Sequence, residues 1–201
     1  IFAATLSTAQ SILWGLGLSL IIGVSSALIF FSIPIARRAV LPFCIFFQTV
    51  PIIAIAPLLV IWFGYGQPTV NASAFIVSLF PILANTLTGL QETDPQLKEL
   101  FRLYKPSRWQ LVFKLQIPSA IPYIITGIKI SAGLAVVGAI VGEFIAGGGL
   151  GSLIDAARTQ QRVDLVFSGV FMSSALALSL VYTINLVTGL LFRNRPYLRK
   201  Q

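Results

Sequence analysis

The side chains best suited to chemistry in this chain of 201 residues are few. It has no histidine, a single cysteine, Cys44, and only six Asp and Glu residues. A lone cysteine excludes disulfide frameworks, and without histidine the Cys/His zinc signatures and the commonest general base are missing. We therefore predict no catalytic residue, no metal site and no cofactor bound by this chain.

Several polar side chains and a proline instead interrupt long apolar runs, where a polar group buried without a partner costs about 2 kcal/mol or more. They could line a polar pathway, or they could bond neighbouring helices together. Gln48, Thr49, Asn85 and Thr86 each favour interhelical bonding when taken alone, whereas their occurrence in adjacent apolar runs favours a pathway. For Pro51 the alternative to a pathway is a simple packing kink. The predicted pathway or gate residues are Gln48, Thr49, Pro51, Asn85, Thr86, Lys129 and Glu143.

Two members of this set, Lys129 and Glu143, are charged. A cation in the middle of a membrane span costs at least about 2.5 kcal/mol, so a pathway, a carboxylate partner or snorkelling must account for Lys129. Glu143 lies about 21 Å further along a continuous helix, which excludes direct pairing of the two within it. Lys129 could attract an anionic solute or face a partner subunit, although structural pairing is favoured. Glu143 suits a gate or cap at the outer boundary of a span.

The elements that position these residues are predicted to be membrane spans. Hydrophobic residues make up 56% of the chain, charged residues 10%, and the mean hydropathy is +0.90, whereas soluble domains carry about 25% charged residues. About 20 apolar residues cross a bilayer. We predict five spans, at Ala9–Ile33, Ala39–Phe63, Thr69–Leu90, Pro118–Gly142 and Leu165–Phe192.

The fold class that follows is an all-α membrane protein, a polytopic helical bundle forming one domain over residues 1–201. The net charge of +8 does not indicate nucleic acid, because the basic residues cluster between apolar runs. Only Arg158 and Arg162 fall on one side of the predicted membrane. The other side receives Arg37, Arg38, Lys98, Arg102, Lys105, Arg108, Lys114, Arg193, Arg195, Arg199 and Lys200.

This asymmetry predicts the orientation, because cationic loops stay in the cytoplasm. We place the more basic side and the C-terminus in the cytoplasm, in the bacterial cytoplasmic (inner) membrane. Five crossings then put the N-terminus outside. Because the sequence starts at Ile1 rather than at Met, we expect one upstream crossing, which would give six in the full chain.

The longest charged stretch lies between the third and fourth predicted spans, at residues 92–105. Asp94 can N-cap a helix there, and Pro95 suits its first position. Ser107 and Gln110 match a capping box that would start a second short helix. The first helix is amphipathic and too short to span, so it could lie flat in the headgroups or dock onto a partner. Its apolar stripe consists of Leu97, Leu100, Phe101 and Tyr104.

This stretch resembles the EAA loop of binding-protein-dependent ABC permeases. The resemblance runs through Glu99-Leu100-Phe101, Ser107-Arg108-Trp109-Gln110 and Ile117-Pro118-Ser119-Ala120-Ile121-Pro122-Tyr123. Leu100 and Phe101 replace the two alanines of that pattern and Lys105 replaces its glycine, so we expect the packing contact to differ in detail. In such families the loop docks into the ATPase subunit, which the resemblance implies for residues 92–117. The implied coupling residues are Leu97, Glu99, Leu100, Phe101, Tyr104, Lys105, Ser107 and Pro118.

Further motifs look like those of the nitrate, sulfonate, taurine and pyrimidine-precursor importer subgroup. They are Gln48-Thr49-Val50-Pro51, Ala56-Pro57-Leu58-Leu59, Trp62-Phe63-Gly64, Gly142-Glu143-Phe144 and Gly147-Gly148-Gly149-Leu150-Gly151. No Gly-Lys-Ser/Thr follows the glycine run, so it is not a nucleotide loop. It predicts a turn before a short helix that starts at Ser152.

The resemblance implies the fold of a type I ABC importer permease and a role in transport rather than catalysis. ATP and Mg²⁺ would bind to separate ATPase subunits, and an extracytoplasmic solute-binding protein would deliver the solute. A second permease copy, most simply a homodimer, would complete the pathway. The implied solute is small and polar or anionic, of the nitrate, sulfonate, bicarbonate or vitamin-precursor type.

Two alternatives from other classes stay open at this point. An ion-coupled secondary transporter would need no ATPase, but it usually carries membrane carboxylates, and only Glu143 comes close. A non-transporting membrane assembly protein would leave the polar residues and the broken helices without a role.

Overall fold

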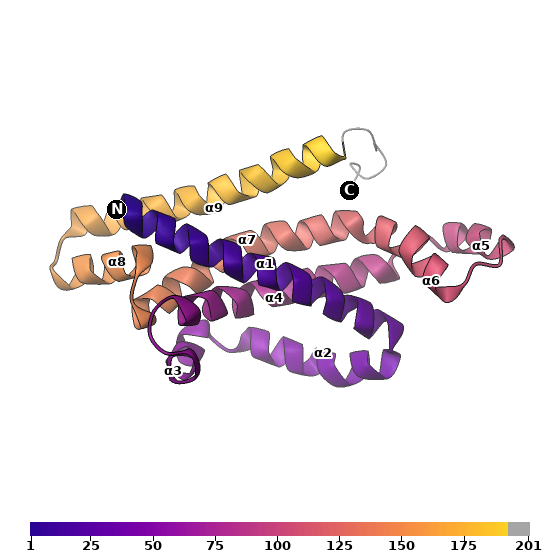
Figure 1. The fold of residues 1–201 in the computed structure, drawn as a ribbon, viewed down its shortest axis with the longest axis horizontal. Helices are drawn as coiled ribbons and strands as arrows, with labels where there is room; N and C mark the ends of the chain where they lie inside the picture. The colour runs from indigo at the N-terminus through magenta and orange to yellow at the C-terminus, as the bar shows by residue number, and fades with distance from the viewer. Residues whose placement is uncertain (193–201) are drawn as a thin grey trace.

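The computed structural model describes residues 1–192, and all of its regular elements are helices that run mostly along one long axis (Figure 1). The short helices α5 (Pro95–Leu103) and α6 (Arg108–Leu111) form one end, and α8 (Gly149–Thr159) lies at the other, where the chain begins. We call these the α5 end and the α8 end. The predicted basic residues Arg193, Arg195, Arg199 and Lys200 lie outside the described residues.

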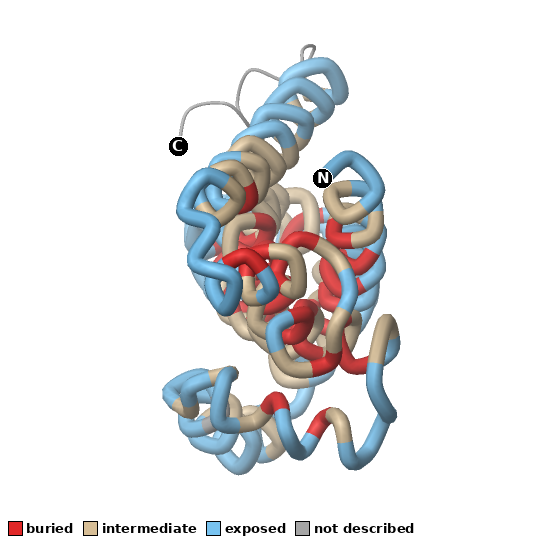
Figure 2. The backbone as a smooth tube through the Cα atoms, turned by 90° about the vertical axis from the view of Figure 1, so that its left-hand side faces the viewer, coloured by how far each residue is buried: buried red, intermediate tan, exposed pale blue. Residues whose placement is uncertain are grey.

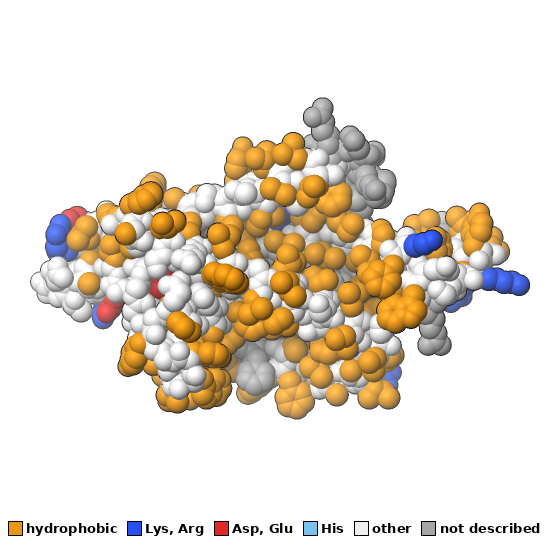
Figure 3. Space-filling model, viewed as in Figure 1, with side chains coloured by type: hydrophobic (Ala, Val, Ile, Leu, Met, Phe, Trp, Pro, Cys, Tyr) orange, Lys and Arg blue, Asp and Glu red, His pale blue; other side chains and the backbone are white. Residues whose placement is uncertain are grey.

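Four helices within residues 1–192 are long and apolar enough to cross a membrane, and they confirm the all-α polytopic fold class. Each contains most of a predicted span. They are α1 (Phe2–Ser32), α4 (Gln67–Gln91), α7 (Ile117–Ala146), which continues an apolar run from Trp109, and α9 (Val163–Leu191). Hydrophobic side chains cover much of the molecule between its ends, and charged side chains are seen mainly toward the ends (Figure 3).

The predicted second span, Ala39–Phe63, is wrong as a single helix. The chain forms α2 (Pro34–Thr49) and then a shorter apolar helix, α3 (Ile52–Phe63). Pro51 disfavours the helical conformation of the residue before it, and Val50 is indeed extended, with φ −72° and ψ 123°. Pro57, in contrast, lies inside α3 without ending it.

Helix α4 lies at the centre of the bundle, between α1 and α7, where buried residues concentrate (Figure 2). Small residues allow the close approach: a Cβ at Gly15 would stand 2.6 Å from the Cβ of Ala74, and one at Gly138 would stand 2.8 Å from the carbonyl oxygen of Ser73. Such contacts replace the hydrophobic driving force that lipid does not supply.

Serine hydroxyls bond the same three helices together. Ser19 and Ser78 share a hydrogen bond of 2.6 Å between α1 and α4, and Ser131 of α7 donates to the Ser78 carbonyl at 2.6 Å. Ser73 donates to the carbonyl of Gly138 at 2.7 Å. These buried bonds explain how polar side chains are accommodated in apolar helices, and they fix the register of α7 on α4.

Helix α9 is peripheral. Only 6% of the most apolar stretch of α9 is buried within the protein, against 56% for that of α4, and the trace of α9 in Figure 2 is largely exposed. It leaves large apolar side chains such as Phe171, Leu178 and Leu186 uncovered. The outer surface of α9 is therefore suited to lipid or to another apolar partner.

Candidate functional site

The segment at the α5 end is built by two local caps that the sequence predicted. The Asp94 side chain accepts a hydrogen bond from the Gln96 amide at 2.8 Å, and Pro95 occupies the first position of α5. The Ser107 amide donates to the Gln110 side chain at 2.9 Å, while the Gln110 amide donates to the Ser107 hydroxyl at 3.2 Å. The predicted N-cap and capping box are both confirmed.

The second helix of this segment differs from the prediction. After only four residues, α6 gives way to a π-helical turn, η1 (Val112–Gln116), which runs directly into α7. The Ile117 amide donates to the carbonyl of Val112, five residues back. π-Helical turns cost backbone geometry and are frequent at functional sites. The segment is thus joined to the long span without a flexible linker.

Lys105 adopts the conformation that glycine would favour. Its φ is +46°, in the left-handed region, which costs a residue with a side chain about 1 kcal/mol. The EAA pattern has glycine at this position. This chain has lysine there, yet the turn between α5 and α6 keeps the left-handed backbone conformation that glycine favours.

The segment leaves a set of large apolar side chains uncovered. Leu100 is 55% exposed, Tyr104 82% and Trp109 72%. Trp109 stacks on Phe113, with ring centroids 5.9 Å apart. This aromatic pair was missed as a functional feature, although its i, i+4 spacing could have indicated it. The uncovered apolar set is Leu97, Leu100, Leu103, Tyr104, Trp109 and Phe113.

The predicted coupling residues lie together in this segment, except that Pro118 stands at the start of α7. Phe101 and Pro118 are half-buried, and the others, Leu97, Glu99, Leu100, Tyr104, Lys105 and Ser107, are exposed. The ion pairs within residues 1–192 join Arg158 to Asp155 and Arg162 to Asp164, so the Glu99 carboxylate is not used in one.

The predicted pathway residues fall into separate places. Gln48, Thr49 and Pro51 are exposed around the break between α2 and α3, and the Thr49 hydroxyl donates to its own helix at Phe46. Asn85 is half-buried and donates to the Pro81 carbonyl at 2.8 Å. No hydrogen bond between side chains joins these residues to one another in the described part of the chain.

Three buried polar atoms in the described residues have no hydrogen-bond partner: the side-chain oxygens of Asn71, Thr86 and Gln116. Thr86 is 1% exposed. Such groups are uncommon because each costs free energy, so they mark places where water, solute or a conformational change could satisfy the oxygen.

Glu143 is withdrawn into a closed polar cluster at the α8 end. It is 1% exposed. The Thr8 hydroxyl donates to its Oε1 at 2.7 Å, the Gly151 amide donates to its Oε2 at 2.8 Å, and the Leu150 amide donates to the Thr8 oxygen at 2.9 Å. We call Thr8, Glu143, Leu150 and Gly151 the acidic knot. It ties α1, α7 and the first turn of α8 together.

Glycines make room for the knot. A Cβ at Gly149 would stand 1.8 Å from Oε1 of Glu143, and Gly149 has φ +62°. The helix starts at Gly149 rather than at the predicted Ser152, because the carboxylate caps amides that would otherwise need a turn of their own. Thr8 was not predicted, since nothing local marks a residue at the start of α1 as a partner of Glu143.

Beyond the knot, α8 ends in an exposed charged turn. Arg158 pairs with Asp155 at 2.8 Å, and Arg162 with Asp164 at 2.8 Å. The hydrogen bond to Asp164, followed by its charge, raises the pKa of the Arg162 guanidinium above its ordinary value. The Arg162 guanidinium therefore stays charged at the α8 end.

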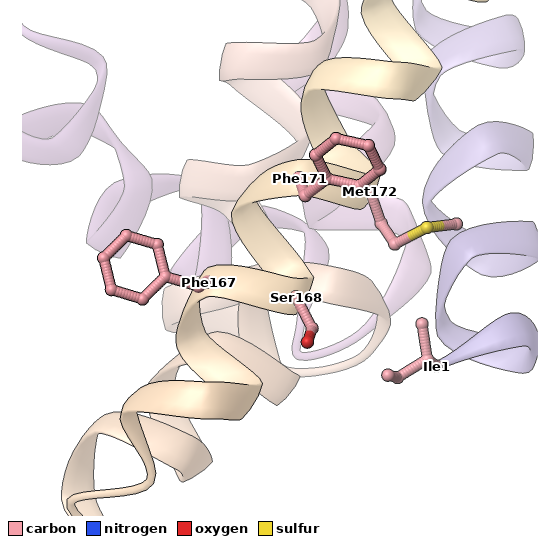
Figure 4. A pocket seen from close by; sticks show the side chains of 5 residues that line it. All are labelled: Ile1, Phe167, Ser168, Phe171 and Met172. Carbon is pink, nitrogen blue, oxygen red and sulfur yellow. The ribbon is translucent and has the colours of Figure 1, made fainter.

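A groove of about 460 Å³ lies between the start of α1 and α9 (Figure 4). It is lined by Ile1, Phe167, Ser168, Phe171 and Met172. The one hydroxyl in this lining, that of Ser168, donates to the backbone of its own helix at Asp164. The groove thus offers apolar contact and little polar recognition, which suits lipid better than a polar solute.

The architecture and the capped amphipathic segment define a class: a polytopic helical membrane protein with a short amphipathic segment at one end. Comparison with known proteins gives the family. Residues 19–194 match the model of the binding-protein-dependent transport system inner membrane component. The chain belongs to that family, and it is the membrane-spanning permease subunit of an ABC importer. This decides against the secondary transporter and the assembly protein.

Individual relatives agree. The chain is 37% identical to the formylaminopyrimidine transport permease protein ThiX of Halalkalibacterium halodurans over 93% of this chain and 74% of that protein. It is 34% identical to the riboflavin transport system permease protein RibX of Chloroflexus aurantiacus over 78% of this chain and 59% of that protein. An inward-facing structure of the MetNI methionine ABC transporter shares the fold, with a TM-score of 0.73 at 17% identity over 92% of this chain and 94% of that one.

Proposed function

We propose that residues 92–117 are the coupling element of a single transmembrane domain, residues 1–201, and that they dock into a separate ATPase that binds ATP and Mg²⁺. The observation that carries this is the uncovered apolar set at the α5 end, held on a helix that is capped at its start. Large exposed apolar patches on a structured element mark interaction sites.

Docking accounts for this segment better than a helix lying flat in the headgroups does. Trp109 and Leu103 are 72% and 77% exposed, and they belong to different helices separated by the turn at Lys105. A helix lying in the interface needs one continuous apolar face parallel to the membrane. Two short helices joined by a tight turn instead present a compact knob that fits a cleft on another protein.

The orientation that accompanies docking puts the α5 end in the cytoplasm, where ATP is available. The distribution of Lys and Arg supports this, and α9 runs from the α8 end back toward the α5 end (Figure 1), so the C-terminus would be cytoplasmic. The α8 end would then face an extracytoplasmic solute-binding protein. A second permease copy would complete the pathway.

Lys129 is the residue we propose to contact solute in that pathway. All six carboxylates of the chain lie elsewhere: Glu92, Asp94 and Glu99 precede or belong to α5, Asp155 and Asp164 bind arginines, and Glu143 is held in the acidic knot. Lys129 lies about 18 Å along the helix axis from the start of α7, which places it well inside the predicted span. Within residues 1–192, Lys129 forms no ion pair with a carboxylate.

A second copy of the same chain would not supply the missing carboxylate either. Two copies inserted in the same direction are related by a rotation about the membrane normal, so every residue keeps its depth. The partner copy would bring another lysine to the depth of Lys129, and no acid. Water or an acceptor group of the solute is the remaining counterpart, because lipid exposure of a cation is costly.

The solute would be small and polar, rich in hydrogen-bond acceptors. The relatives named for formylaminopyrimidine and riboflavin transport support a nitrogen heterocycle, and the ammonium group of Lys129 would equally suit a small anion. Mass spectrometry of the ligand retained by the cognate binding protein identifies it. A purely apolar ligand would contradict this solute class.

The coupling role is tested with Glu99→Arg combined with Leu100→Asp in the complete transporter. We expect the variant to reach the membrane but to lose solute uptake and its ATPase partner, because the docking face gains charge. The matched control carries Thr126→Ser on α7, away from the docking face. Undiminished uptake in the double variant, or a wild-type permease that co-purifies with no ATPase, would refute the coupling proposal.

A further inference from the structure

The acidic knot lies where α8 starts, directly after a run of glycines. Gly147, Gly148 and Gly149 precede or begin α8, and all three have positive φ. Cβ atoms built at Gly147 and Gly148 would meet nothing within 4 Å, so a side chain at either position would have no packing partner. A run of glycine is flexible. The hydrogen bonds of Glu143 and Thr8 therefore fix where α8 begins.

Packing holds only one side of α8 in place. Leu150, Ile154 and Ala157 are buried along that side. Ile154 packs on Gly169 of α9, since a Cβ added at Gly169 would stand 2.5 Å from the Ile154 side chain. Gly151 also lies close to α7, because a Cβ there would stand 2.5 Å from the carbonyl oxygen of Ile140. The knot adds hydrogen bonds that join this start of α8 to both α1 and α7.

The charged turn at the end of α8 is exposed and contributes little to stability. The Arg158 side chain is 72% exposed and that of Arg162 is 54% exposed. Exposed ion pairs contribute little to stability. Arranged charges at a surface do steer and orient protein association, and this turn lies at the end of the molecule opposite the coupling element (Figure 1).

We propose that Thr8 and Glu143 are positioning residues for transport: the acidic knot sets the place of α8, so that its charged turn at Arg158 and Arg162 meets the extracytoplasmic solute-binding protein. This inference rests on the proposed function, since it takes the α8 end as the side that receives the binding protein. Neither residue touches the solute. Their effect reaches transport through the placement of α8.

The experiment uses the complete transporter with its ATPase in proteoliposomes, and the probe is the cognate binding protein purified with the solute that it retains. The measured quantity is the binding-protein concentration that gives half-maximal stimulation of ATP hydrolysis. In Thr8→Val, we expect this concentration to rise about tenfold while the maximal rate is retained. Thr8→Ser keeps the hydroxyl and should behave as the wild type. The half-maximal concentration for Glu143→Gln should lie between the values for Thr8→Ser and Thr8→Val.

Two further variants make the test specific. Arg158→Glu combined with Arg162→Glu leaves the knot intact and should raise the same concentration, because it reverses the displayed charges. Ser131→Ala removes a buried hydrogen bond of similar length in the centre of the bundle. This variant should leave the half-maximal binding-protein concentration unchanged. A shift in Ser131→Ala equal to that in Thr8→Val would show general destabilisation and overturn the positioning role.

The remaining outcomes separate the two proposals. An unchanged half-maximal concentration in Thr8→Val, with a normal wild-type response, would overturn the role of the knot and leave the proposed function standing. A wild-type transporter that hydrolyses ATP without responding to any binding protein would overturn the proposed function, and the role of the knot with it.

Discussion

At the α8 end, the Glu143 carboxylate is withdrawn from solvent and hydrogen-bonded through both of its oxygens, whereas at the α5 end Tyr104 and Trp109 stand 82% and 72% exposed. Burying a charge is tolerable only when its hydrogen bonds are made, and exposing large aromatic groups is tolerable when another protein covers them. The knot is complete within the chain. The uncovered apolar set is the surface that we propose the ATPase covers.

This difference predicts opposite consequences of mutation. Changes at the acidic knot should reduce the stability of the permease itself, because the groups left behind are buried and unpaired. Changes at the uncovered apolar set should leave stability nearly unchanged and reduce association with the ATPase.

The largest effect is expected from Gly149→Ala. The new Cβ would overlap the Glu143 carboxylate, 1.8 Å from Oε1, so the carboxylate must leave the knot and its hydrogen bonds are lost. We expect a loss of about 3–5 kcal/mol in the free energy of unfolding in detergent. Gly148→Ala is the control, since its Cβ meets nothing within 4 Å and only backbone strain of about 1–3 kcal/mol applies. Equal losses would mean that the contact with the carboxylate is unimportant.

Much of the α5 end was predictable, because its signals are local. The Asp94 cap and the capping box of Ser107 and Gln110 depend on residues two or three positions apart. The acidic knot was not predictable in the same way. Its bond between Thr8 and Glu143 joins residues 135 positions apart, and only the placement of α1 beside α7 and α8 brings them together.

The spans show the same limit. Apolar run length found α1, α4, α7 and α9, since lipid imposes that length on any crossing helix. It missed the break at Val50 because a Pro inside an apolar run can either kink or end a helix, as Pro57 and Pro51 illustrate. Composition also could not tell that the Glu143 carboxylate is hydrogen-bonded inside the bundle, while Lys129 has no carboxylate partner within residues 1–192.

A smaller effect is expected from Thr8→Val, which keeps the size of the side chain and removes its hydroxyl. Glu143 Oε1 and the Leu150 amide would both lose a partner, which should cost about 1–3 kcal/mol. Thr5→Val is the matched control one turn earlier, where the hydroxyl bonds only to the Ile1 carbonyl. Thermal unfolding of the two variants in the same detergent makes the comparison. Similar midpoints would indicate that the hydroxyl of Thr8 contributes nothing special.

At the α5 end, Lys105→Gly should increase stability rather than reduce it. Lys105 has φ +46°, and glycine adopts this conformation without a steric cost, so the turn should gain about 1 kcal/mol or less. Because α5 is a local unit, the readout is hydrogen exchange of the α5 amides, which should slow by up to about fivefold. Faster exchange would show that the lysine side chain holds the turn in place.

The smallest change in stability is expected from Trp109→Ala, and it tests the comparison most directly. The indole is 72% exposed and its stacking partner is Phe113, whose ring is also largely exposed, so its removal should change the free energy of unfolding by about 0.5 kcal/mol or less. The same change should sharply reduce the ATPase that co-purifies with the permease, because aromatic anchors contribute much of the binding energy at interfaces. Phe171→Ala on the outer surface of α9, at 72% exposure, is the control, and it should retain the ATPase. If Trp109→Ala destabilises the permease as much as Gly149→Ala does, then Trp109 belongs to the folded core rather than to a surface that binds a partner.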